Sequence, residues 1–142
     1  MLRKVPFLLA LLMLACLGAS GQDPQRITIK PVCKTSFTIP TRSSETCTFD
    51  APPGLRRVRI VGEFRVSGGP DDTIEVWVMD DAQFTKWQNQ HSVETIYNSK
   101  KLSQGLLNLF LTQPGKFHVI FSNDSSDTPK SVEARLTLRL VR

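Results

Sequence analysis

Arginines alternate with apolar residues along two segments of this 142-residue chain. Five of them share a parity within their segment, three in 57–66 and two in 131–140: Arg57, Arg59, Arg65, Arg135 and Arg139. Guanidinium groups bind phosphate and sulfate through paired N–H donors. If the two segments are neighbouring strands, this basic face can bind sulfated or phosphorylated glycans or lipid head groups. The alternative is a solvated sheet face, in which Glu63 and Glu133 relieve the repulsion between the arginines.

Four aromatic residues follow in the middle of the chain: Trp77, Phe84, Trp87 and Tyr97. Grouped on a surface, they form an aromatic platform that stacks on sugar rings or receives a side chain of a partner. The alternative is that Phe84 and Trp87 close the open end of a hydrophobic core. A short amphipathic helix needs such tertiary packing to persist.

The acidic residues of the same region could hold Ca²⁺ through their carboxylates: Asp71, Asp72, Asp80 and Asp81. We interpret the first two as turn residues after Gly-Gly-Pro, and the last two as caps of a helix. The chain contains no G-x-S-x-G and no H-E-x-x-H motif, and His91 and His118 stand far apart. We therefore predict no catalytic residues, no metal, no cofactor and no enzymatic activity.

Cys33 and Cys47 are predicted to form a disulfide. An exported protein folds in an oxidising compartment, where an even number of cysteines favours disulfide formation. The bond would close a loop of about 15 residues and contribute about 3 kcal/mol on the chain-entropy estimate. A zinc site is the weaker interpretation, because it needs four ligands at structural spacing.

The first 21 residues have the pattern of a signal peptide. Arg3 and Lys4 precede a short apolar run over 5–14, and Ala19-Ser20-Gly21 supplies the small residues of a cleavage site before Gln22. Alternatively, 13–16 resembles a lipobox, in which Cys16 is acylated and anchors the protein. Removing Arg3 and Lys4 lowers the formal net charge from +5 to +3, a balance too slight to indicate a nucleic-acid partner.

The remaining residues, 22–142, are predicted to form one all-β domain. The final segment alternates most clearly, with Val132, Leu136 and Leu140 on one parity and polar residues on the other. Similar segments recur at sandwich spacing, and we expect eight or nine strands in an antiparallel two-sheet β-sandwich of jelly-roll type. One short helix is expected near 81–89, capping one end of the sandwich. The apolar side of 57–66 carries Gly62, which suggests a bulge or a close backbone approach.

Three segments together resemble a known family. They are the strand-to-helix passage 75–89, the piece Y-N-S-K at 97–100, and above all P-G-K-F-H-V-I-F-S-N-D-S-S at 114–126. The last resembles the closing hairpin of Golgi-dynamics (GOLD) luminal domains, which are β-sandwiches that recognise proteins. The chain is also similar to small exported bacterial proteins without an assigned activity and to bacterial pre-peptidase C-terminal modules. It departs from the cargo receptors at Ile120 and Phe121, where their hairpin carries a cysteine.

The sequence therefore predicts an exported, non-enzymatic interaction module, periplasmic or extracellular, that binds protein or glycan through its loops and one sheet face. The alternative is an envelope-associated protein, held by acylated Cys16 or by arginines that face anionic lipid. We expect a monomer that contacts a membrane only if Cys16 is lipidated.

Overall fold

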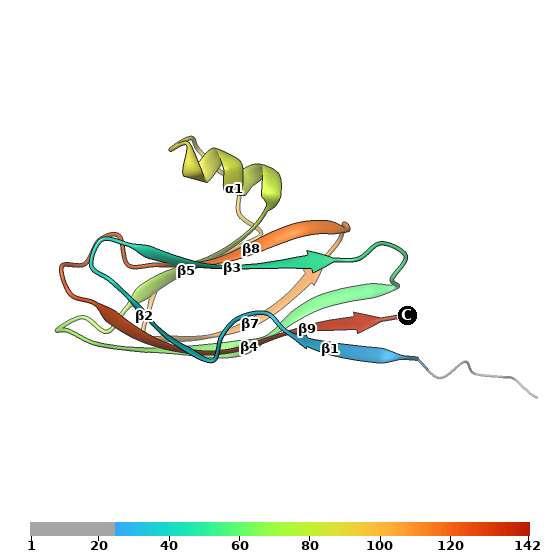
Figure 1. Ribbon diagram of the computed structural model, residues 1–142, viewed down its shortest axis with the longest axis horizontal. Coiled ribbons are helices and arrows are strands. Elements are labelled where there is room, and N and C mark those ends of the chain that lie inside the picture. Colours follow the sequence, from blue (N-terminus) through green and yellow to red (C-terminus); the bar gives the residue numbers. More distant parts are fainter. Residues whose placement is uncertain (1–24) are drawn as a thin grey trace, which may run out of the picture.

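The computed structural model describes residues 25–142, which form two antiparallel sheets with one short helix. Nine strands build the sheets, which stack as the two layers of an all-β sandwich (Figure 1). This confirms the predicted fold class. The predicted leader, 1–21, and Cys16 lie outside the described residues.

Sheet A forms one layer, with the strand order β1-β9-β4-β7 and with β2 pairing a second stretch of β9. Its strands are β1 (Ile27–Pro31), β2 (Ser36–Ile39), β4 (Arg57–Ser67), β7 (Gln104–Leu111) and β9 (Lys130–Val141). The central pair is β4 and β9, which face each other over their whole common length from Arg57↔Val141 to Ser67↔Ser131. The two arginine-bearing segments are therefore direct neighbours.

Sheet B forms the other layer, with the strand order β3-β8-β5-β6. Its strands are β3 (Ser44–Ala51), β5 (Ile74–Asp80), β6 (Tyr97–Leu102) and β8 (Gly115–Ser122). The helix α1 (Asp81–Gln88) follows β5 without a break. Asp80 begins it as the N-cap, because its carboxylate accepts a hydrogen bond from the Gln83 amide at 2.8 Å.

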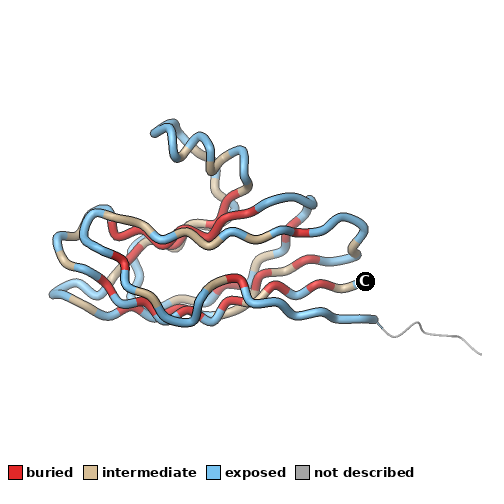
Figure 2. Tube along the Cα trace, viewed as in Figure 1, coloured by how far each residue is buried: buried red, intermediate tan, exposed pale blue. Residues whose placement is uncertain are grey.

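The core lies between the sheets and is built from every second residue of the strands. The alternating side of β9 is buried as predicted, from Val132 at 0% exposure to Leu140 at 5%. Figure 2 shows the same alternation of buried and exposed positions along both layers. Phe64 of sheet A meets Phe121 of sheet B edge to face, with ring centroids 6.3 Å apart. Burial of one face of each sheet thus accounts for the two-layer architecture.

Gly62 marks a close approach between the two central strands of sheet A. A Cβ atom at this position would lie 1.9 Å from the carbonyl oxygen of Arg135 on β9. The predicted close backbone approach is confirmed, and it requires glycine because the obstacle is backbone.

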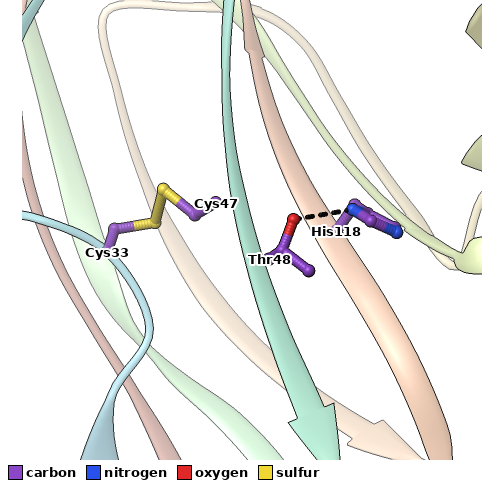
Figure 3. The surroundings of a disulfide bond; sticks show 4 residues. All are labelled: Cys33, Cys47, Thr48 and His118. Carbon is purple, nitrogen blue, oxygen red and sulfur yellow. Dashed lines mark hydrogen bonds between the residues drawn. A yellow bond between two sulfur atoms is a disulfide. The ribbon is translucent and has the colours of Figure 1, made fainter.

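Cys33 and Cys47 form the predicted disulfide, with their Cα atoms 5.4 Å apart. Cys33 lies between β1 and β2 and Cys47 lies on β3, so the bond joins the two sheets (Figure 3). The chain passes from sheet A to sheet B between β2 and β3, so the two cysteines belong to different layers.

The helix does not cap an end of the sandwich, contrary to expectation. It packs on β5 and β8 and lies over the outer face of sheet B (Figure 1). Phe84 and Trp87 therefore do not close the core. Beneath the helix layer, two outward residues of sheet B, Met79 and Ile120, are 0% exposed.

Candidate binding face

All five arginines lie on the outer face of sheet A, but the strand register divides them into two groups. Arg59 lies directly opposite Arg139, and Arg57 lies opposite Val141. Arg65 lies opposite Glu133, and Arg135 opposite Glu63. The predicted single basic field is therefore two regions of different charge.

We call the first region the arginine patch: Arg57, Arg59 and Arg139 with the apolar residues Ile27, Ile29, Phe110 and Val141 around them. Across the sheet, β1, β9, β4 and β7 contribute one row of four residues: Ile29, Arg139, Arg59 and Phe110. The guanidinium groups of Arg59 and Arg57 lie over the Phe110 ring, 5.1 and 5.9 Å from its centroid. Arg59 also donates a hydrogen bond to the Asn108 side-chain oxygen.

Acidic partners are missing from this patch. Among residues 25–142, the ion pair that joins an arginine to a carboxylate is Arg42 with Asp127, and its residues lie outside the patch. Every side chain directly opposite a patch arginine is apolar or another arginine. Three positive charges on neighbouring positions therefore remain without a carboxylate beside them.

Exposed apolar side chains distinguish the patch from an ordinary solvated face. Ile27 and Ile29 are each 59% exposed and Phe110 is 53% exposed. Leu106, which is 75% exposed, lies opposite Glu63 and therefore outside this patch. The alternation R-I-T-I-K in residues 26–30 was the signal that could have identified both isoleucines, because it places them on one side of an edge strand.

A groove of about 710 Å³ follows the β1 side of the arginine patch. Ile27, Ile29 and Val141 supply apolar walls, and Arg57, Arg59 and Arg139 supply the charge. Arg56 and Gln25 complete the lining of the groove. Its lining joins cations to aliphatic surface, the chemistry that an anionic amphiphile requires.

We call the second region the charge-balanced patch: Glu63, Arg65, Glu133 and Arg135. Each arginine lies opposite one glutamate across β4 and β9, at a spacing where opposite charges attract. All four residues are exposed. This end of the sheet matches the solvated-face alternative that the sequence left open.

The predicted aromatic platform is divided by sheet B. Trp77, Phe84 and Trp87 gather on the outer side, with the two tryptophan rings 6.1 Å apart and Phe84 stacked 5.7 Å from Trp87. Tyr97 lies opposite the buried Val78 and packs against the core on the inner side. The three outer aromatics are each partly buried, since they hold the helix against the sheet.

His118 fixes this helix, a role that the sequence did not indicate. Its Nδ1 lies 3.0 Å from the Thr48 hydroxyl, and its Nε2 lies 2.8 Å from Asp81 at the start of α1. Phe84 stacks on the imidazole ring at 3.8 Å. Figure 3 shows Thr48 and His118 on the side of β3 opposite to the disulfide.

Hydroxyl, imidazole and carboxylate occur here in the order of a nucleophilic triad. A general base must also reach the substrate, and this ring is 4% exposed beneath Phe84. The arrangement therefore ties α1 to sheet B.

The acidic residues considered for Ca²⁺ are occupied by local hydrogen bonds. Asp71 accepts from the Thr73 hydroxyl and Asp72 from the Gly68 amide, each at 2.6 Å. The buried ammonium of Lys130 donates to the carbonyls of Gly68 and Asp71 in the same turn. Within residues 25–142, no three His, Cys, Asp or Glu side chains gather as a metal site would need.

No family model matches the chain, and no curated protein matches it. In the described part, no helix is long and apolar enough to cross a membrane.

Proposed function

We propose that this protein is an exported, non-enzymatic interaction module that binds an anionic ligand through the arginine patch of sheet A. The observation that carries the proposal is the combination of three unneutralised arginines with exposed Ile27, Ile29 and Phe110. A face that needed only solvation would place opposite charges side by side, as the register does in the charge-balanced patch.

Three further features support this proposal. The disulfide between Cys33 and Cys47 is typical of oxidising compartments outside the cytosol. The leader-like pattern of residues 1–21 agrees with export. The resemblance of 114–126 to GOLD-type hairpins supports a binding habit, since those sandwiches recognise proteins.

Binding of defined polyanions to the immobilised protein tests the proposal. The probes are heparin, a polyglutamate peptide and vesicles that contain phosphatidylglycerol, each compared with an uncharged counterpart. We expect at least one polyanion to bind and to lose affinity when Arg57, Arg59 and Arg139 are changed to alanine. Failure of all three to bind, or equal binding by the variant, would contradict the proposal.

A second candidate function, association with the cell envelope, is favoured by the position of Gln25 in the groove. Cys16 stands nine residues before Gln25 in the sequence, so an acylated cysteine would hold this patch near a membrane. Mass spectrometry of the mature N-terminus separates the candidates. Gln22 as first residue indicates release, whereas acylated Cys16 indicates an anchored protein.

A further inference from the structure

The arrangement of the arginine patch indicates which class of anionic ligand it accepts. Neighbouring strands lie about 4.8 Å apart, so the row from Ile29 through Arg139 and Arg59 to Phe110 spans about 14 Å. Its cations occupy the centre and its apolar side chains the two ends. The ligand must therefore offer negative charge and apolar surface side by side over a comparable width.

A lipid bilayer with anionic head groups offers both at its interface. Phosphates lie beside the upper acyl region, where aromatic and aliphatic side chains insert while arginines remain at head-group level. A sulfated glycan would satisfy the arginines and leave Ile27 and Ile29 in water. The exposed apolar fraction of these two side chains thus favours lipid over a purely polar polyanion.

The arginines are arranged to receive more than one phosphate. Arg57 and Arg59 both lie over Phe110, which limits their freedom before any ligand arrives. Of five N–H donors, Arg59 uses one on Asn108, so most of its fork is free. Arg139, across the strand pair, adds a second centre of charge.

The entry point of the chain agrees with a membrane on this side. Gln25 lines the groove, and Cys16 stands nine residues earlier in the sequence, within about 30 Å of extended chain. A diacylated Cys16 would hold the arginine patch within that distance of the bilayer, so the anchor and the patch would act on the same membrane.

We propose that the arginine patch docks on bilayers rich in anionic phospholipid, with Ile27, Ile29 and Phe110 entering the interface around the three arginines. This inference rests on the proposed function and names its ligand class. The arginines bind lipid phosphates, and the apolar side chains bury against acyl chains.

Vesicle co-sedimentation tests the inference, with a Cys16→Ser chain expressed with its leader and purified after export, so that acylation cannot contribute. Vesicles of phosphatidylglycerol and phosphatidylcholine are compared with phosphatidylcholine alone. The test variant carries Arg57→Ala, Arg59→Ala and Arg139→Ala. A matched control removes equal charge elsewhere with Arg42→Ala, Arg65→Ala and Arg135→Ala. Circular dichroism and thermal melting confirm that each variant folds.

We expect the parent chain to bind the anionic vesicles and not the neutral ones. Each arginine near an anionic surface contributes about fivefold in affinity, so the test variant should bind roughly 100-fold more weakly. The control should change by less than about threefold if its arginines face no lipid. A further variant, Ile27→Ser with Ile29→Ser, should weaken binding about tenfold at unchanged charge.

Three outcomes would overturn the lipid assignment: no binding of the parent chain to anionic vesicles, an equal loss in the control, or no effect of the isoleucine changes. If heparin or polyglutamate still binds through the patch, the proposed binding function stands and the lipid assignment falls. If no polyanion binds through the patch, both fall.

Discussion

The outer faces of sheet A and sheet B differ in what packs on them. On sheet B, α1 covers the strands, and His118 lies beneath Phe84 with both ring nitrogens hydrogen-bonded. On sheet A no helix or strand of residues 25–142 lies over the outer face (Figure 1), and Ile27, Ile29 and Phe110 are each more than half exposed. The chain thus supplies its own cover for one face and leaves the other open.

This difference separates a structural aromatic cluster from a candidate binding face. Aromatic residues on a surface suggest recognition, yet Trp77, Phe84 and Trp87 contact one another and hold the helix. In the arginine patch, Arg57 and Arg59 contact Phe110, but no carboxylate lies opposite any of the three cations. Exposed apolar side chains that surround unpaired cations indicate a ligand more strongly than aromatic residues that satisfy one another.

The largest expected effect comes from a substitution at the contact between β4 and β9, the two central strands of sheet A. Gly62→Ala places a Cβ against the Arg135 carbonyl and forces β4 and β9 apart. We expect a loss of about 4 kcal/mol in the free energy of unfolding, or failure to fold. Urea denaturation measures it. Gly54→Ala, where no atom lies within 4 Å, is the control and should cost about 1 kcal/mol. Equal losses would show that the strand contact is not the cause.

The disulfide joins sheet A to sheet B, and its removal should have the second largest effect on the free energy of unfolding. Changing Cys33 and Cys47 to serine should lower the free energy of unfolding by about 3 kcal/mol. The midpoint of thermal melting, with and without reductant, measures this. Reductant should leave the serine variant unaffected, and an unchanged parent melting point under full reduction would contradict the prediction.

Releasing α1 from sheet B should lower the free energy of unfolding without changing ligand binding on the outer face of sheet A. His118→Ala removes the contacts with Thr48, Asp81 and Phe84 that hold α1. We expect a loss of about 2 kcal/mol, since a buried ring and two hydrogen bonds disappear. Polyanion binding at a temperature where the variant is folded should equal that of the parent protein. A selective loss of binding would place the ligand on sheet B instead.

The smallest expected effect comes from single arginine substitutions, which should distinguish the arginine patch from the charge-balanced patch in vesicle binding. Arg59→Ala should reduce affinity for anionic vesicles about fivefold, whereas Arg65→Ala, opposite Glu133, should leave it nearly unchanged. Co-sedimentation over a series of lipid concentrations measures both. Identical effects would mean that the two patches act as one field.

The alternating segments were sufficient to predict the sandwich. The pattern of Val132 to Leu140 places one side of β9 in the core without knowledge of its neighbours. The alternating pattern could not predict which charged residues lie side by side, because Arg59↔Arg139 and Arg65↔Glu133 depend on the register between distant strands. Neither local propensity nor composition fixes that register, so the division into two patches emerged only in three dimensions.

The aromatic residues show the same limit. The sequence grouped Tyr97 with Trp77, Phe84 and Trp87, whereas Tyr97 begins β6 opposite Val78, on the core side. The position of α1 was also not predictable, since a two-turn helix after β5 can turn toward either the sandwich end or the outer face. In the structure, contacts of His118 with Asp81 and Phe84 hold α1 on the outer face. In the sequence, His118 is an isolated histidine without a sign of this role.

A ¹H–¹⁵N NMR titration with a short-chain phosphatidylglycerol would show most directly whether the arginine patch binds anionic phospholipid. We expect amide shift changes at residues 27–29, 57–59 and 139–141, together with Phe110, and none at the four residues of the charge-balanced patch. Changes confined to α1 and β5, or spread equally over Glu63, Arg65, Glu133 and Arg135, would contradict this expectation.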